Sequence, residues 1–355
     1  SAIKTPIKPE QSTMAHSHRS SMSFCLVCIV VMAAAAALLQ PASSQQAVPD
    51  IPNLKVGSND RSTTLKCTNI KSNKTTCSAT CNARCPHKCL IQCPSCKTFC
   101  LCDFYPGVSC GDPRFTGADG NNFYFHGKKD RDFCIVSDAA LHINAHFIGK
   151  RNPAMSRDFT WIQALGIRFA HHHLYVAAQR TPRWDAAADH LALALDDEDV
   201  DVASLLPRFV GARWSPPTAP ALSVTRTARV NTVVVELRGA FRIVASVVPI
   251  TAEDSRIHNY GVREDDGDTL AHLDLGFKFY DLTDDVHGVL GQTYRPDYVN
   301  SLNVTSNMPV MGGAPDYLSS DLFSTDCAVA RFGGRRHQQA TAANIAMLTD
   351  DDDME

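Results

Sequence analysis

Histidine and acidic residues are the side chains from which catalysis in this chain would have to start, and their spacing matches none of the common catalytic motifs. His142 and His146 lie four residues apart in an alternating apolar and polar segment. On a β-strand they would be about 13 Å apart, too far to share one metal ion. We therefore expect both to be surface or interface residues.

The other candidates have equally simple explanations. Residues 171–173 are three consecutive histidines at an expected hairpin, and exposed turn polarity explains them as well as metal binding does. Ser255 and His258 lie near two acids in the sequence, but no GxSxG turn surrounds the serine. The chain also lacks an HExxH zinc motif and a phosphate-binding glycine loop. We expect no catalytic residue and no bound metal ion.

Cysteine spacing carries a stronger chemical signal. Of the fourteen cysteines, Cys25 and Cys28 fall in an expected export signal, which leaves an even number in the mature chain. Ten of these lie between residues 67 and 110, where apolar side chains are too few to form a core. We therefore predict that disulfide bonds hold this segment together. The predicted disulfide cysteines are Cys67, Cys77, Cys81, Cys85, Cys89, Cys93, Cys96, Cys100, Cys102, Cys110, Cys134 and Cys327.

Zinc binding is the alternative for the cysteine-rich segment, because Cys93 and Cys96 have the spacing of a metal-finger pair. A zinc site would need a second pair at a matching distance and a reducing compartment. The four-residue spacing from Cys77 to Cys93 suits one face of a helix, and it leaves open whether the segment is helical. We favour disulfides, with no prediction of their connectivity inside the segment.

Cys134 and Cys327 are the only cysteines after residue 110, and their pairing is the simplest prediction. Such a bond would close a loop of roughly two hundred residues and stabilise the fold by roughly 4–5 kcal/mol. Cys110 is a competing partner for either of them.

The cysteine-rich segment is also basic. Seven cations and no acid lie between residues 61 and 102, namely Arg61, Lys66, Lys71, Lys74, Arg84, Lys88 and Lys97. We expect this basic set to bind an acidic cell-wall polysaccharide or mucilage, such as pectin, through an attraction that salt screens. The alternative is that these cations only keep a core-poor segment in solution. The net charge of −3 gives no indication of nucleic-acid binding.

An export signal is expected near the start of the sequence. From Met14, which we take as the natural start, a short segment with one arginine precedes an apolar run at residues 24–39 and small residues up to Ser44. This is the pattern of a cleaved secretory signal peptide, although an uncleaved anchor is the alternative. We therefore expect a secreted, extracellular or cell-wall protein that is free of the membrane after cleavage. The sequons at Asn73 and Asn303 would then be glycosylated.

From residue 115 onward the chain reads as a succession of strands. Alternation at 141–147 is strict, and strand patterns follow at 159–169, 174–178, 224–230, 232–237, 241–248 and 272–280. Residues 191–195 suit a strand that ends in an acidic turn, or a short helix. Asn231 and Gly239 lie at hairpin spacing between neighbouring strands. We expect antiparallel sheets packed face to face, with a short helix at 317–326.

The boundary stretch CGDPRFTGADGNNFYFHG, residues 110–127, contains the most distinctive motif. Together with LHINAHFIGKR, EDSRIHNYG, HLDLGFKFY, GVLGQTYRP and MPVMGG further on, it resembles the plant root-cap, late-embryogenesis-related family, from about Cys77 to Phe332. More distantly, its GDP, its DG turn and its FYF strand are similar to the opening of a von Willebrand factor type D domain. That second resemblance would imply calcium, but residues 288–297 contain one acid only, so we expect no cofactor.

These patterns predict five segments. They are upstream residues and a signal peptide (1–44), a linker (45–66), a disulfide module (67–110), a root-cap-type β-sandwich-like domain (111–332) and a disordered acidic tail (333–355). The root-cap resemblance implies a secreted protein of plant tissue that is exposed to abrasion or drying, and it brings no established activity. We expect a structural or polysaccharide-binding matrix protein without catalysis. The alternative is a secreted carbohydrate-active hydrolase with a pair of acids in a β cleft.

Overall fold

The computed structural model describes residues 64–68, 74–81, 89–93, 95–103, 105–153, 155–263, 265–302, 306 and 308–333. The expected signal peptide, most of the expected linker, both sequon asparagines and the tail beyond residue 333 lie outside these residues. Within the described residues, no helix is both long and apolar enough to cross a bilayer. Strands make up most of the regular structure, and the helices are few and short.

Two antiparallel sheets form the β domain. The first sheet has seven strands in the order β13-β12-β11-β10-β9-β8-β19, namely β8 (Arg131–Ser137), β9 (Leu141–Lys150), β10 (Phe159–Phe169), β11 (His172–Ala178), β12 (Leu191–Leu195), β13 (Glu198–Asp199) and β19 (Leu318–Ser319). The second has eight in the order β14-β15-β16-β17-β18-β5-β6-β7, namely β5 (Val108–Cys110), β6 (Arg114–Thr116), β7 (Asn122–Tyr124), β14 (Arg213–Trp214), β15 (Leu222–Arg226), β16 (Thr232–Leu237), β17 (Phe241–Val248) and β18 (His272–Phe279). The predicted strand at 191–195 is therefore confirmed over the helical alternative.

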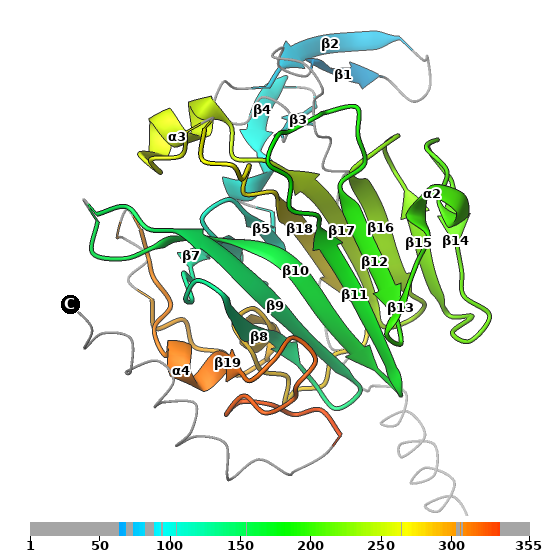
Figure 1. Ribbon diagram of the computed structural model, residues 1–355. Helices are drawn as coiled ribbons and strands as arrows, with labels where there is room; N and C mark the ends of the chain where they lie inside the picture. Colours follow the sequence, from blue (N-terminus) through cyan, green and yellow to red (C-terminus); the bar gives the residue numbers. More distant parts are fainter. Residues whose placement is uncertain are drawn as a thin grey trace, which may run out of the picture. The chain divides into compact units, whose positions relative to one another are not determined.

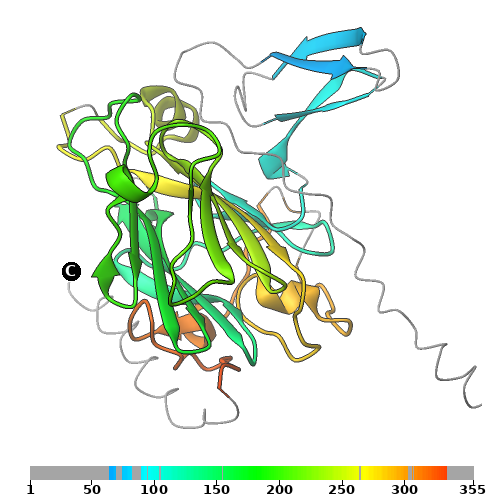
Figure 2. The same cartoon turned by 90° about the vertical axis from the view of Figure 1, so that its right-hand side faces the viewer.

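The two sheets lie face to face over one shared core (Figures 1 and 2). Strands β10 and β11 of the first sheet lie against β17 and β18 of the second. Alternate residues point inward, so that Ile143, Ala145 and Phe147 of β9 share this core with Ile243 and Ala245 of β17, and all five are fully buried. The mainly β, antiparallel sandwich expected from the sequence is thus confirmed.

The turns between the central strands form where turn residues were expected. Asn231 links β15 to β16 with a φ of 62°, and Gly239 links β16 to β17 with a φ of 80°. A side chain on Gly239 would have open space around it, so the positive φ, and not crowding, is the reason for glycine there. Because both turns formed at the expected residues, β16 and β17 begin and end as predicted.

The outer face of β9 is buried at His142 and Asn144, although its polar residues predicted a solvent-facing surface. Residues 318–333, which we name the C-terminal strap, cross this face. Asn144 donates hydrogen bonds from Nδ2 to the carbonyl oxygens of Leu322 (3.2 Å) and Ser324 (2.7 Å). At Gly166 on β10, a Cβ would lie 2.3 Å from the carbonyl oxygen of Leu322, so only glycine permits so close a crossing.

The prediction of a short helix at 317–326 is wrong. Helix α4 (Ala314–Tyr317) ends where the prediction placed its start, and Leu318 and Ser319 continue as β19, which pairs with β8. The outer edge of β8 offers unpaired backbone groups, and pairing with them satisfies the strap's own N–H and C=O groups.

The remaining helices of the described residues are one or two turns long. They are η1 (Leu101–Asp103), α2 (Val202–Leu205), α3 (Ala252–His258) and η2 (Gly291–Tyr294). Thr251 and Asp254 form a capping box at the start of α3. Just after α3, Tyr260 packs edge-on against Phe159 and Trp161 of β10 in a small second apolar cluster.

The cysteine-rich segment forms two small hairpins where it is described. Strand β1 (Thr64–Thr68) pairs with β2 (Thr75–Thr80), and β3 (Cys89–Gln92) pairs with β4 (Lys97–Cys100). Residues 77–80 and 89–92, which the four-residue cysteine spacing could have placed on a helix, are therefore strands. Strand β1 begins three residues before Cys67, inside the segment expected to be a linker.

Candidate functional site

Disulfide bonds account for the cysteines of the described residues. The bonded pairs are Cys67–Cys93, Cys77–Cys96, Cys81–Cys89, Cys102–Cys110 and Cys134–Cys327. Cys100 is also disulfide-bonded, and Cys85 lies outside the described residues. Both members of the possible zinc pair, Cys93 and Cys96, thus have their sulfurs in disulfides, which leaves no thiolate to bind a metal. The predicted pairing of Cys134 with Cys327 is confirmed.

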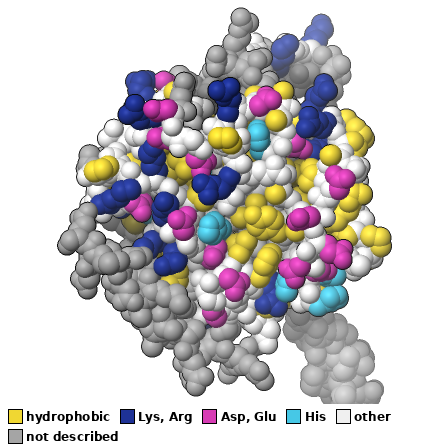
Figure 3. Space-filling view, viewed as in Figure 1, with side chains coloured by type: hydrophobic (Ala, Val, Ile, Leu, Met, Phe, Trp, Pro, Cys, Tyr) yellow, Lys and Arg dark blue, Asp and Glu magenta, His cyan; other side chains and the backbone are white. Residues whose placement is uncertain are grey.

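Three of the seven predicted polyanion-binding residues lie in the described part of the chain. Lys66 on β1, Lys74 before β2 and Lys97 on β4 are all exposed. The other four, Arg61, Lys71, Arg84 and Lys88, lie outside it. On the face of the protein seen in Figure 3, lysine and arginine side chains are interspersed with aspartate and glutamate. In the sequence of the cysteine-rich segment, by contrast, no acid lies among the seven cations of residues 61–102.

His142 is fully buried, so the expectation that it lies at the surface is wrong. Its Nδ1 lies 2.8 Å from the hydroxyl of Ser137, and its Nε2 lies 2.9 Å from Oδ1 of Asn144 and 3.6 Å from the sulfur of Cys134. A serine beside a histidine is a nucleophile pair in many hydrolases. Here both are fully buried, and the Ser137 hydroxyl accepts from the backbone N–H of Arg331, so the group holds the C-terminal strap and no substrate reaches it.

The other histidines are dispersed over the fold. His146 is half-buried and forms an ion pair with Asp132 (2.9 Å), which raises the pKa of His146 above its ordinary value. In the triple-histidine run His171 and His173 border a turn, but His172 is buried and contacts Asp196 at 2.7 Å. The explanation of this run as exposed turn polarity is therefore incorrect for its central residue.

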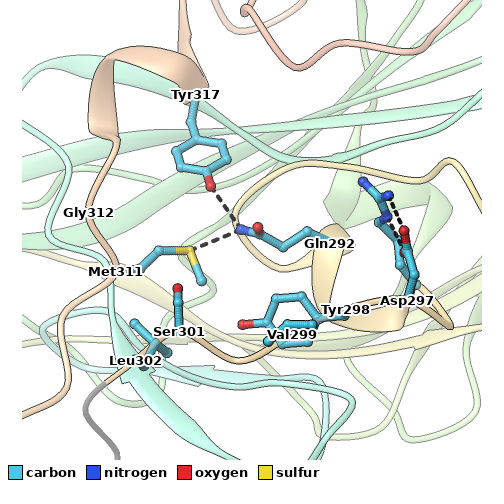
Figure 4. A pocket seen from close by; sticks show the side chains of 10 residues that line it. Gln292, Asp297, Tyr298, Val299, Ser301, Leu302, Met311, Gly312 and Tyr317 are labelled. Atoms are coloured by element: carbon cyan, nitrogen blue, oxygen red, sulfur yellow. Dashed lines mark hydrogen bonds and ion pairs between the residues drawn. The ribbon is translucent and has the colours of Figure 1, made fainter.

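A hollow of about 410 Å³ opens beside η2 and α4 (Figure 4). Its lining residues are Gln292, Arg295, Asp297, Tyr298, Val299, Ser301, Leu302, Met311, Gly312 and Tyr317. Gln292 on η2 donates from Nε2 to the hydroxyl of Tyr317 (2.9 Å) and to the sulfur of Met311 (3.2 Å), and so joins the two sides of the hollow. Sequence reasoning did not find this site, although two of the quoted motifs, GVLGQTYRP and MPVMGG, contain four of its residues.

The motif GVLGQTYRP builds one wall of the hollow by docking on β8. Val289 and Leu290 donate backbone hydrogen bonds to the carbonyl oxygens of Cys134 and Ile135, each 2.9 Å long. Gly288 has a φ of 108°, and a Cβ there would lie 2.6 Å from the carbonyl oxygen of Ile135. Glycine at this position is what lets the chain come so close to β8 and then turn into η2.

The charges at the hollow are already paired. Arg295 donates from Nε and Nη2 to the two carboxylate oxygens of Asp297 at 2.9 and 2.7 Å, and this contact lowers the pKa of Asp297. Asp297 is the single acid of residues 288–297, the stretch compared with a calcium loop. Burial raises the pKa of Tyr298 and of Tyr317, so both hydroxyls keep their protons. The lining residues thus provide aromatic, amide and hydroxyl groups, with one carboxylate where a glycosidase needs two.

His287 lies just before the docking motif, and its burial changes its affinity for a proton. Burial lowers its pKa to about 4, and the nearby charges of Arg331 and Arg295 act in the same direction against those of Asp285 and Asp316. Its Nδ1 accepts a hydrogen bond from the backbone N–H of Gly288 at 2.9 Å. The folded protein therefore keeps this ring neutral under conditions in which the unfolded chain protonates it.

We expect the free energy of unfolding to fall as the pH drops from 6.5 to about 4, because the unfolded chain binds the His287 proton first and the folded state gains it only below that range. Replacing His287 with glutamine should flatten this slope, measured by urea unfolding at a series of pH values. Replacing His258, which is exposed, is the control and should leave the slope in place. An unchanged slope in the His287 variant would contradict the assignment of this pH dependence to His287.

A second group of charged residues joins two of the quoted motifs, residues 110–127 and EDSRIHNYG. Asp112 of GDPRF forms an ion pair with Arg157 (2.6 Å), and His126 of FYFHG lies 3.6 Å from the same carboxyl. Burial opposes ionisation of Asp112, but His126 and Arg157 outweigh it and lower its pKa. Tyr260 of EDSRIHNYG lies near this group, and burial together with the charge of Asp112 raises its pKa. Because Arg157 already neutralises Asp112, the arrangement suits a structural clamp better than a general base.

Residues 276–332 match the family model described as Root cap. The root-cap resemblance found in the sequence is confirmed over that stretch, and the resemblance to von Willebrand factor type D domains stays a prediction. No curated protein matches the chain. All ten residues that line the hollow lie inside the matched segment, between residues 292 and 317.

Proposed function

Starting from the root-cap family match at residues 276–332, we propose that this chain is a secreted, disulfide-stabilised protein of the plant cell wall or extracellular matrix. It binds acidic polysaccharide such as pectin or mucilage and has no catalytic activity. The observation that carries this proposal is the basic set on a disulfide-bonded segment, of which Lys66, Lys74 and Lys97 are exposed.

Disulfides make this segment suited to binding a charged polymer. The described apolar residues there form only a small cluster of cysteines with Leu65 packed against it. Cross-links therefore replace a core as the source of rigidity, and they leave the surface free for polar and charged side chains. On a rigid frame the backbone loses little conformational freedom when a polyanion binds, and each exposed cation contributes a modest attraction that salt screens.

Replacing Lys66, Lys74 and Lys97 together with glutamine is expected to lower the affinity for polygalacturonate about tenfold at low salt, since exposed charge pairs contribute roughly 0.5 kcal/mol each. Binding is measured by titration calorimetry of the mature, oxidised protein at two salt concentrations. The matched control replaces three exposed cations of the β domain, Arg183, Arg208 and Arg229, and should retain most of the affinity.

Failure of the unaltered protein to bind at either salt concentration would remove the adhesive function. Equal losses in the lysine variant and the arginine control would mean that overall charge, and not the cysteine-rich segment, drives binding. A catalytic function would appear instead as shortening of the polymer during the titration, which size-exclusion chromatography of the recovered polysaccharide detects.

A further inference from the structure

Three polar groups without a protein partner converge on the hollow of the root-cap segment. Within the part of the chain that the structure describes, Oε1 of Gln292 and the hydroxyls of Tyr298 and Ser301 make no hydrogen bond to protein. Figure 4 shows the three side chains around the same space, with the Nε2 side of Gln292 already engaged by Tyr317 and Met311. They offer two hydroxyls and one acceptor to a ligand rich in hydroxyl groups.

Apolar and aromatic surface lies beside these groups. Val299 is 81% exposed, and Leu302 and Met311 also line the hollow. The half-buried ring of Tyr298 presents a flat face of the kind that stacks on the C–H face of a sugar ring. A few placed polar groups within apolar surface are typical of small-molecule sites, and the volume of about 410 Å³ lies within their usual range of ~300–1,000 Å³.

The charges of the hollow disfavour an anion. Arg295, the only cation among its lining residues, is already bound to both carboxylate oxygens of Asp297. The carboxylate of Asp297 is in turn neutralised by Arg295, so the pair has no net charge and the hollow offers no free counter-charge to a carboxylate that loses its water there. An ionised uronic acid therefore fits this hollow poorly, whereas an uncharged sugar ring meets no such penalty.

We infer that the hollow binds an uncharged saccharide ring, and specifically the methyl-esterified uronate of a pectin-like chain. The ester removes the negative charge for which the hollow has no free counter-charge, and it adds a methyl group for Val299, Leu302 and Met311. This inference takes its ligand class from the proposed function, but it concerns a different site. The cysteine-rich segment takes the charged stretches of the polymer, and the hollow takes the esterified stretches.

The test uses two oligogalacturonides of equal length, one fully methyl-esterified and one fully de-esterified, titrated into the mature oxidised protein at low and high salt. Tyr298→Ala and Ser301→Ala should each weaken binding of the esterified oligomer about tenfold or more, with little dependence on salt. Binding of the de-esterified oligomer should be unchanged in both variants. Ser301 is exposed, so its truncation leaves folding intact, and the thermal midpoint checks this for Tyr298→Ala.

Two comparisons keep the two sites distinguishable. Tyr280→Ala removes an exposed tyrosine that does not line the hollow, and it should leave both affinities unchanged. The triple lysine variant should bind the de-esterified oligomer about tenfold more weakly at low salt and keep its affinity for the esterified one. The inference is overturned if the unaltered protein does not bind the esterified oligomer, or if Tyr298→Ala and Ser301→Ala both bind it normally. Neither result would contradict the proposed function, which is tested separately by binding of the de-esterified oligomer.

Discussion

Replacing both Cys134 and Cys327 with serine is expected to lower the free energy of unfolding by roughly 5 kcal/mol, the largest single effect in the β domain. The bond joins residues 193 apart, so its loss frees a very long loop in the unfolded chain. Both cysteines are fully buried, and the bond holds the C-terminal strap against β8. Urea unfolding followed by tryptophan fluorescence measures the loss.

The matched control removes the Cys102–Cys110 bond, which joins residues only 8 apart. On the chain-entropy relation its loss costs roughly 2–3 kcal/mol, about half as much. Equal losses in the two double variants would show that loop length does not govern the stabilisation.

The second large effect is expected from Asp189, which forms a buried ion pair with Arg226. The Arg226 side chain is fully inaccessible, and its Nε donates to the carbonyl oxygen of Leu206 at 2.7 Å. Replacing Asp189 with asparagine keeps the shape but leaves this guanidinium buried without a counter-charge. We expect a loss of about 3–5 kcal/mol in the free energy of unfolding, measured by urea titration.

Asp268→Asn provides the control for this prediction. Asp268 pairs with Arg180, whose side chain is 75% exposed, so its loss should cost no more than about 1 kcal/mol. Similar losses in the two variants would contradict the claim that burial makes the Asp189 pair important. Replacing Asp189 and Arg226 together with apolar residues should recover part of the stability, because no uncompensated charge then remains.

Hairpin positions were predictable because their cause is local. Asn231 and Gly239 adopt positive φ angles that few other residues tolerate, so the residue types alone indicated where β16 would begin and end. The pairing of Cys134 with Cys327 was also accessible, because the other cysteines are concentrated in a segment that forms its own bonds. In both cases the relevant alternatives were few and visible in the sequence.

The candidate hollow could not be predicted in the same way. Gln292 and Tyr317 are 25 residues apart, and they meet only because η2 docks on β8 while α4 leads into β19 on the same strand. Gly288 was a signal of this docking, but a glycine with positive φ does not reveal which strand it approaches. The motifs indicated which residues mattered without indicating that they line one space.

The sequence by itself indicated most of the long strands and the turns between the central ones, although β15 runs from Leu222 to Arg226 where a strand at 224–230 was expected. It also indicated the disulfide-rich character of the first segment and its excess of positive charge. Each of these follows from residue type and short-range spacing. Only the tertiary structure decided that His142 is buried, that Arg226 needs Asp189, and that residues 292–317 enclose a hollow. The physical reason is that alternation along a strand shows which residues can face a core, whereas burial of the opposite face depends on a distant segment, here the C-terminal strap, crossing over it.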